Sequence, residues 1–241
     1  MRILPLKEGD FLNTGKKERN KIRRMVLTAL FTAMAYAVTF LFHIKVSFLT
    51  FDAKDTVICI SAMLMGPAAS TVAAFAVSLI EFLTVSDTGF WGFLMNFISS
   101  AAFSGIAGLI YRNERKLWGA ACGLAAAIAA GTVVMLLLDM LVIPIYNPGV
   151  TAGTVAGMIP ALLLPFNIVK YTLNAALVLA LYKPISSALK RSGMLPASGI
   201  ENNEKYKFGI RSVIVFAVAA AVCAACVCVL IFVFHGTFGR G

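Results

Sequence analysis

The segment Leu164–Asn174 carries the most chemically versatile side chains in a mostly apolar part of the chain. Successive residues of an α-helix are about 100° apart, so four of its polar residues share one face: Asn167, Lys170, Tyr171 and Asn174. An ammonium, two amides and a phenol can bind a polar ligand through hydrogen bonds. The same groups can instead satisfy one another and neighbouring carbonyls where helices pack.

The composition predicts an integral membrane protein. The chain has 241 residues, of which 60% are hydrophobic and 13% charged, whereas a soluble domain is about half apolar and about a quarter charged. The length allows roughly seven spans of about 20 residues. Inside a membrane, an ammonium or an amide costs several kcal/mol unless it has a partner. The polar face therefore needs partners from other helices.

The apolar runs predict seven helices, at about 25–42, 56–65, 68–85, 90–110, 119–143, 155–189 and 210–234. The run 56–65 is short for a complete crossing of the bilayer. The preceding segment, His43–Asp55, is too apolar for a free loop and predicts a plug or lid over the polar face. Pro144 is expected to break the fifth helix. The last run carries no buried polar residue and is typical of an anchor outside any site.

The placement of positive charge predicts the topology. Lys and Arg collect in residues 16–24, 112–116 and 183–211, and loops rich in these residues stay on the cytoplasmic side. The N-terminus is therefore expected in the cytoplasm and, after seven spans, the C-terminus outside the cell. This placement explains the net charge of +10 better than a nucleic-acid partner does.

This topology brings polar residues from five segments into the outer half of the membrane. They are the segment His43–Asp55, Glu81, Asn96, Asp139, and the pair Asn167 and Lys170. Expensive polar groups from distant parts of the chain at one depth favour an outward-facing binding pocket over helix packing alone.

Five motifs in this order resemble the substrate-binding S component of energy-coupling factor (ECF) vitamin transporters, most closely the riboflavin type. The motifs are Phe48–Asp55, Met65-Gly66-Pro67, Gly92–Phe97, Pro144-Ile145-Tyr146, and Leu164–Lys170 with Asn174. The resemblance covers about residues 25–190. It implies an all-α integral membrane protein with a six-helix S-component bundle, to which this chain adds one extra C-terminal transmembrane helix.

The resemblance also implies function and partners. An S component captures its vitamin, here riboflavin, from outside and delivers it with a transmembrane coupling subunit and two cytoplasmic ATPase subunits. The sequence contains no Gly-rich phosphate loop ending in Gly-Lys-Ser/Thr, so partners must hydrolyse the ATP. A stripe of small residues at Ala29, Ala33 and Ala37 resembles the surface that docks on the coupling subunit. No cofactor, metal or nucleic acid is expected, and membrane lipid surrounds the helices.

Carried over by position, Asn167 and Lys170 would hydrogen-bond the polar edge or the ribityl chain of the flavin. The candidate substrate-binding residues are Phe48, Leu49, Phe51, Asp52, Glu81, Asn96, Asp139, Asn167, Lys170 and Asn174. Phe48, Phe51 and Phe97 would supply apolar walls for the ring. Asp139 stands where the riboflavin-type pattern has Asn, and an ionised acid accepts hydrogen bonds without donating them. An Asp139–Lys170 ion pair would give both residues a structural role instead.

The predicted division of the chain has four parts. Residues 1–24 form a basic cytoplasmic tail, 25–191 the six-helix substrate-binding domain, 192–208 a cytoplasmic linker, and 209–235 the additional transmembrane helix. An S component for another vitamin or small molecule stays open, as does a self-sufficient secondary transporter, although no clear internal repeat supports the latter. An enzyme is disfavoured because the sequence has only two His and no metalloprotease or serine-hydrolase motif.

Overall fold

The computed structural model describes residues 8–41, 43–46, 49–84, 89–147, 149–194, 210–233 and 237–238. Its elements, with η marking π-helical turns, are α1 (Glu8–Leu41), β1 (His43–Val46), β2 (Leu49–Asp52), α2 (Lys54–Met65), α3 (Pro67–Thr84), α4 (Gly89–Asn113), α5 (Leu117–Tyr146), α6 (Ala152–Met158), η1 (Ile159–Leu163), α7 (Leu164–Arg191), α8 (Ile210–Cys228), η2 (Val229–Val233) and β3 (Thr237–Phe238). Within the described ranges, six helical stretches are long and apolar enough to cross a membrane. The chain is a multi-pass membrane protein.

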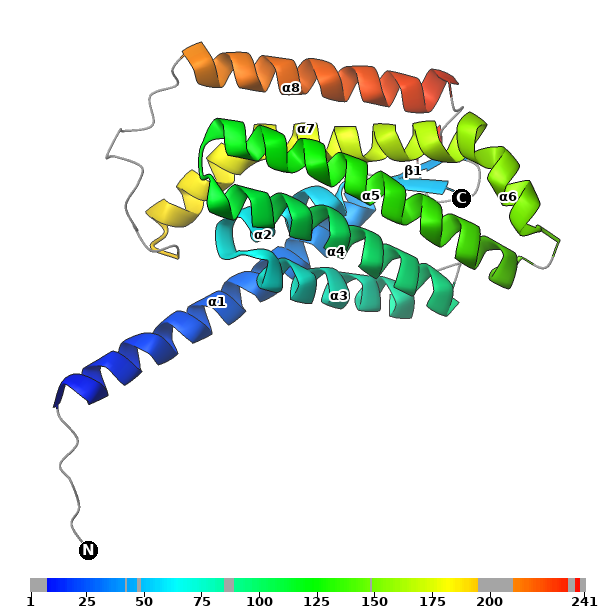
Figure 1. The fold of residues 1–241 in the computed structure, drawn as a ribbon. Helices are drawn as coiled ribbons and strands as arrows, with labels where there is room; N and C mark the ends of the chain where they lie inside the picture. Colours follow the sequence, from blue (N-terminus) through cyan, green and yellow to red (C-terminus); the bar gives the residue numbers. More distant parts are fainter. Residues whose placement is uncertain are drawn as a thin grey trace, which may run out of the picture.

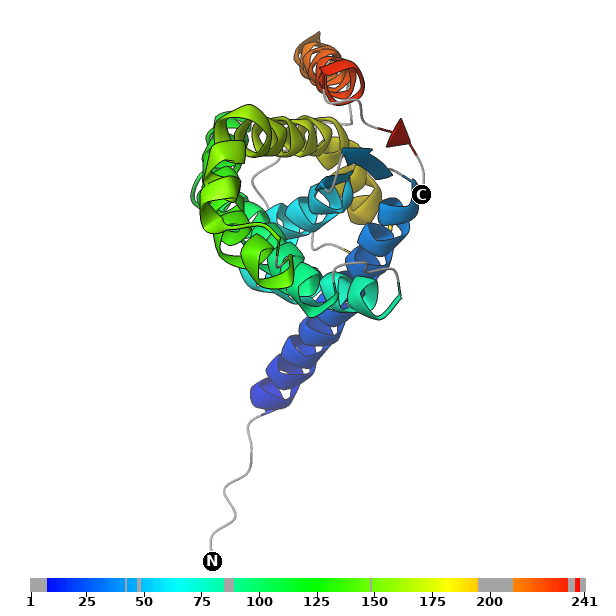
Figure 2. The same cartoon turned by 90° about the vertical axis from the view of Figure 1, so that its right-hand side faces the viewer.

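The short helix α2 lies at the centre of the bundle, and the longer helices surround it (Figure 2). It has 12 residues, a length of about 18 Å, against about 30 Å for the hydrocarbon core of a bilayer. Every residue of α2 except Leu64 is buried. The predicted helix at 56–65 is therefore confirmed, beginning two residues earlier, but it is an internal helix, and six stretches rather than seven are long enough to span.

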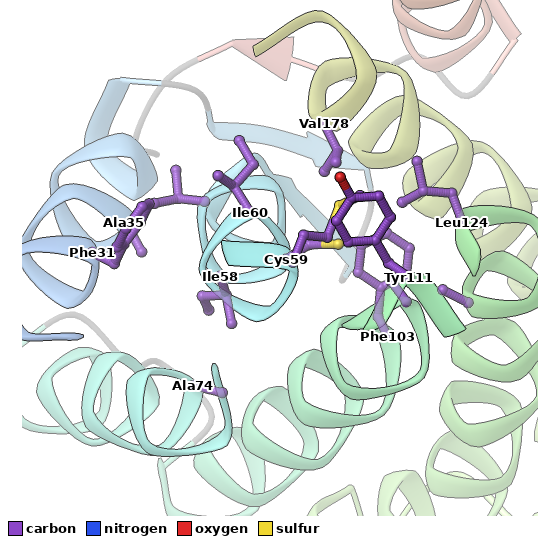
Figure 3. Close-up of a cluster of buried hydrophobic side chains, with 14 of the residues drawn as sticks. Phe31, Ala35, Ile58, Cys59, Ile60, Ala74, Phe103, Tyr111, Leu124 and Val178 are labelled. Carbon is purple, nitrogen blue, oxygen red and sulfur yellow. The ribbon is translucent and has the colours of Figure 1, made fainter. Parts of the chain in front are cut away.

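The core forms on all sides of α2 because its apolar residues are not confined to one face. Ile58, Cys59 and Ile60 leave the helix in different directions (Figure 3). They pack in one cluster with residues of the surrounding helices, among them Phe31, Ala74, Phe103 and Val178. The contact with α4 is especially close, since a Cβ on Gly108 would lie 2.8 Å from the Cβ of Ala62. This core fixes the positions of the helices that carry the polar residues.

The segment predicted as a plug or lid forms a β-hairpin. Strands β1 and β2 pair antiparallel, with His43 opposite Asp52 and Val46 opposite Leu49. The short strand β3 pairs with the other edge of β1, giving the order β2-β1-β3. The hairpin lies at the end of the bundle opposite to the end at which α4 and α7 finish (Figure 1).

The helix that carries the polar face begins irregularly. Thr151 caps α6 by accepting a hydrogen bond from the backbone N–H of Thr154 at 3.3 Å. The π-turn η1, which contains Pro160, then leads into α7 with Pro165 in its first turn. Prolines and π-turns are common causes of bends in long helices. Figure 1 shows α6 turned away from the axis of α7.

Two helix boundaries differ clearly from the prediction. α5 continues through Pro144 to Tyr146, so the proline lies in the last turn and not at the break. α1 begins at Glu8, so helix extends through much of the predicted tail. Of the predicted linker 192–208, only residues 192–194 belong to the described ranges. The basic residues at 112–116 and 183–191 share one end of the bundle (Figure 1), and the side of the membrane that this end faces stays a prediction.

Candidate functional site

A buried ion cluster, formed by Asp52, Lys54 and Glu81, lies at the base of the hairpin. The Nζ of Lys54 is 2.5 Å from Oε2 of Glu81 and 3.6 Å from Oδ2 of Asp52. Thr39 Oγ1 donates to Glu81 Oε1 at 3.1 Å, and Asn96 Nδ2 donates to Glu81 Oε2 at 3.4 Å. The cluster therefore ties the junction of β2 and α2 to α1, α3 and α4. Three predicted site residues, Asp52, Glu81 and Asn96, come together here.

Lys54 and its neighbour Asp55 are absent from the candidate set drawn from the sequence, which placed both in an outside segment. Their side chains are buried, at 2% and 1% exposure. The length of α2 carries the missed signal. A helix of about 18 Å that reaches one membrane surface must begin about 12 Å below the other. Charged residues at its start are therefore inside the membrane.

Asn174 has a structural role in this bundle. Its Oδ1 accepts from the backbone N–H and the hydroxyl of Thr56, at 3.1 and 2.7 Å. Its Nδ2 donates to the carbonyls of Lys170 and Asp52, at 3.1 and 3.4 Å. Asn174 thus supplies from α7 the cap that the first turn of α2 lacks in its own sequence. The prediction that it binds substrate stays a prediction, but its amide is fully occupied by protein groups.

A second group of buried residues has hydrogen-bonding atoms that form no hydrogen bond within the described structure. It combines three residues of the α7 face with two carboxylates, and from here on we call this whole group the polar face. It consists of Asp55, Asp139, Asn167, Lys170 and Tyr171. In the described part of the chain, both carboxylate oxygens of Asp139, Oδ2 of Asp55 and the hydroxyl of Tyr171 are buried and make no hydrogen bond of 3.5 Å or less, although Asn167 lies beside Asp139 and Ser99 beside Tyr171. Such atoms are uncommon in folded proteins and call for an explanation. A ligand that supplies hydrogen bonds would explain them.

Lys170 is the cation of the polar face. It is 5% exposed, and among the described residues its ammonium has one long hydrogen bond, 3.5 Å to the carbonyl of Thr50 on β2. Asp55 and Asp139 are its electrostatic neighbours. No ion pair of 4.0 Å or less joins Asp139 to Lys170 within those residues, so the alternative of a direct structural pair is not realised. The ammonium keeps donors available for a ligand.

Asn167 and Tyr171 are held by the backbone around them. Asn167 Nδ2 donates to the carbonyl of Leu163, in the π-turn, at 2.9 Å. The ring of Tyr171 stacks on Phe103 with centroids 5.2 Å apart. It also lies against Gly131 of α5, where a Cβ would approach the ring to 3.0 Å. The glycine is what allows Tyr171 to reach across to α5.

The apolar residues of the candidate set lie in different parts of the structure. Leu49 and Phe51 are buried in a cluster that also contains Phe166 and residues of α5, α6, α7 and α8. Phe48 lies outside the described residues. Phe97 belongs to a group of rings on α3 and α4, 5.5 Å from Phe75. Among the predicted walls, Phe51 packs beneath the hairpin, whereas Phe97 faces neighbouring aromatic side chains.

The small-residue stripe lies on the outer surface of α1. Ala29, Ala33 and Ala37 are exposed, whereas Phe31 and Ala35, on the opposite side of the helix, are buried in the core. The stripe is thus not used by the helices of this chain. Its proposed contact with another subunit stays a prediction.

Among the described residues, the hairpin half of the bundle holds an excess of buried acidic groups. Four buried carboxylates are present, on Asp52, Asp55, Glu81 and Asp139, with two buried ammonium groups, on Lys54 and Lys170. If all are ionised, the formal charge is −2. Nowhere in the described ranges do three or more His, Cys, Asp or Glu side chains gather as they would around a metal ion. The arrangement therefore suits an organic ligand that donates hydrogen bonds.

Comparisons with known proteins find relatives that cover most of this chain. A family model described as "ECF transporter, substrate-specific component" matches residues 23–185. The riboflavin transporter RibU of Staphylococcus aureus (strain TCH60) is 28% identical over 178 residues, which is 70% of this chain and 93% of RibU. A solved structure described as "Structure and mechanism of the S component of a bacterial ECF transporter" has a TM-score of 0.59 and 28% identity, covering 71% of this chain and 99% of that chain. The family match ends before α8.

Proposed function

The chain belongs to the substrate-specific components of ECF transporters, and we propose that the substrate it captures is riboflavin. As a family member it is the substrate-binding membrane subunit that works with an ECF transporter module. The similarity to RibU supports this ligand. The observation that carries the proposal is the set of buried hydrogen-bonding atoms on the polar face that make no hydrogen bond within the described residues.

The flavin is chemically complementary to that set. One rim of its ring carries an imide N–H between two carbonyls, and the ribityl chain adds hydroxyls that both donate and accept. The oxygens of Asp139 can accept from an imide or a hydroxyl, and the ammonium of Lys170 can donate to a carbonyl. Asn167 adds an amide that can donate or accept a hydrogen bond. Buried groups of this kind also discriminate against analogues that lack the matching atom.

The other predicted polar residues support the site without touching the ligand. Glu81, Asp52 and Asn96 are engaged around Lys54, and the amide of Asn174 is used at the start of α2. A ligand would have to break these contacts to use the same atoms. We therefore assign direct contact to Asp139, Asn167 and Lys170, and structural support to the ion cluster and Asn174.

The direction of capture follows from the position of the polar face near the hairpin end of the bundle. With the basic end in the cytoplasm, as the positive-inside rule predicts, the hairpin faces outward and covers the site. The N-terminus is then cytoplasmic and the end of α8 extracellular. In this orientation the exposed stripe of Ala29, Ala33 and Ala37 docks on the coupling subunit, and two ATPases supply energy. The division into 1–24, 25–191, 192–208 and 209–235 belongs to the same proposal.

One observation favours a second candidate ligand. The formal charge of −2 among the buried ionisable groups would be lowered by a cationic small molecule. Asp139, in place of the Asn of the riboflavin-type pattern, adds to that charge. A different, positively charged vitamin is therefore the alternative substrate for the same subunit.

Identification of the bound molecule tests both candidates. The protein is purified in mild detergent from cells, its absorbance is recorded in the visible flavin bands, and released ligand is identified by mass spectrometry. We expect flavin in the unmodified protein and much less in Asn167→Leu, with Asn113→Leu at the exposed end of α4 as the matched control. A colourless protein without measurable riboflavin affinity would refute this ligand.

A further inference from the structure

The C-terminal segment lies outside the family match, which ends at residue 185, yet it contacts the cover of the candidate site. α8 runs alongside α7, outside the ring of helices (Figures 1 and 2). After α8 and η2, the chain returns to the hairpin as β3. An anchor with no part in the site, which is what the sequence predicts for this helix, would not need that return.

The first contact is between strands. β3 pairs antiparallel with β1, with Ile44 opposite Phe238 and Lys45 opposite Thr237. β1 therefore has a partner on each side, β2 and β3. An unpaired edge leaves backbone groups unsatisfied, and an isolated two-strand hairpin is only marginally stable. The third strand therefore restrains the hairpin.

The second contact is apolar and independent of the first. Cys226 and Leu230, near the end of α8, are buried in the cluster that contains Leu49 and Phe51 of β2. Leu230 has 0% exposure, whereas Phe232 and Val233, on the same π-turn, are 76% and 65% exposed. The last turns of this helix thus present one side to the underside of the hairpin and the other to lipid.

The hairpin is in turn joined to the polar face. The carbonyl of Thr50 accepts from Lys170, and the carbonyl of Asp52 accepts from Asn174. A ligand that approaches Lys170 from the hairpin side meets β2, because the carbonyl of Thr50 lies 3.5 Å from the ammonium. Whatever restrains β1 and β2 also controls access to the polar face.

We propose that α8, η2 and β3 act together as a strap that holds the hairpin over the substrate site and sets the rate of ligand exchange. The strap makes this chain's S component slower to load and to release than the six-helix unit alone. Cys226, Leu230, Thr237 and Phe238 are its positioning residues. The inference rests on the proposed function only in its choice of riboflavin as the probe.

A disulfide between the paired strands tests the strap in the full chain. The Cα atoms of opposite residues in antiparallel strands are about 4.5–5.5 Å apart, which is within the range that disulfides span. Lys45→Cys and Thr237→Cys are combined in a background in which Cys59, Cys122, Cys223 and Cys228 are alanine and Cys226, which packs under the hairpin, is valine. We expect oxidation to cross-link them and to slow riboflavin release at least several-fold, and a reductant to restore the original rate. Each single-cysteine variant is the control.

A packing variant gives an independent measure. Leu230→Ala should release riboflavin several-fold faster at temperatures well below its melting temperature, which this buried substitution also lowers. Leu230→Ile should restore the slow rate, and Val233→Ala on the exposed side should change nothing. Equal release rates in oxidised and reduced protein, or no cross-link at all, would overturn the strap. If riboflavin binds to no form, the proposed ligand fails. The strap is then judged by hydrogen exchange of the β2 amides, which must slow on oxidation for the strap to stand.

Discussion

Replacing Lys170 by methionine tests whether the polar face binds ligand or only supports the fold. Methionine keeps the length of the side chain and removes its charge and donors. In the described structure the ammonium makes one long contact, 3.5 Å to the carbonyl of Thr50, so its loss removes only one weak hydrogen bond from the unliganded protein. A hydrogen bond from Lys170 to a ligand carbonyl would be worth about 1–3 kcal/mol. The Kd for riboflavin should therefore rise by about 5-fold to about 150-fold.

The same substitution changes the charge balance, so the two effects must be separated. Without Lys170, Asp55 and Asp139 lose a cationic neighbour, and the melting temperature should fall because buried charge is left uncompensated. Adding Asp139→Asn removes one carboxylate and should restore stability. The hydrogen bond from Lys170 is still missing in the double variant, so its affinity should stay low.

Riboflavin titration of detergent-purified protein, followed by flavin fluorescence, gives the affinity, and thermal unfolding gives the stability. Lys116→Met is the matched control, because the side chain of Lys116 is 79% exposed. Unchanged affinity in Lys170→Met would assign Lys170 to structure. Full recovery of affinity in the double variant would show that Lys170 acts by charge balance and not by contact with ligand.

Three further substitutions separate support, capping and docking. Glu81→Gln leaves Lys54 without its closest carboxylate and should lower the free energy of unfolding by about 3–5 kcal/mol; a combined Lys54→Met, Glu81→Leu and Asp52→Asn variant, which removes the whole ion cluster, should recover most of it, and no loss in the single variant would argue against a buried ion pair. Asn174→Leu should destabilise the protein by about 1–3 kcal/mol by leaving the N–H of Thr56 unpaired, measured by thermal unfolding; a loss of riboflavin affinity at full stability would return Asn174 to the binding residues. Ala33→Trp should abolish uptake into cells while binding persists, whereas Ala129→Trp, also on an exposed face, should transport normally; uptake unaffected by Ala33→Trp would exclude this docking surface.

The polar residues of the candidate site could be predicted from the free-energy cost of burying a polar side chain in a membrane. A membrane chain has few polar side chains inside its apolar runs, and each needs a reason to be there. Asn167, Lys170, Asp139, Glu81 and Asn96 were all identified in this way, and all five lie toward the hairpin end of the bundle. The six-helix bundle followed from the order of five motifs, and the family match confirms it.

What each polar residue contacts could not be predicted from one sequence. The spacing that puts Asn174 on the same face as Lys170 gives no sign that its amide caps α2. Lys54 was read as a loop residue because hydropathy says nothing about depth, whereas the central position of a 12-residue helix does. The strand β3 could not be predicted either. Its two residues are too few to show the alternating pattern of a strand, and its partner strand lies nearly 200 positions earlier in the chain.

Two groups of buried charges lie in the hairpin half of the bundle. The ion cluster of Asp52, Lys54 and Glu81 is satisfied within the protein and joins α1, α3 and α4 to the base of the hairpin. The core packed between the helices limits how far α5 and α7 can move toward each other, and among the described residues no ion pair of 4.0 Å or less joins Asp139 to Lys170. A side chain keeps its donors and acceptors for a ligand only if its surroundings prevent it from forming hydrogen bonds or ion pairs within the protein. In this chain the charges of the ion cluster are paired with one another, whereas Asp139 and Lys170 keep hydrogen-bonding atoms for a ligand.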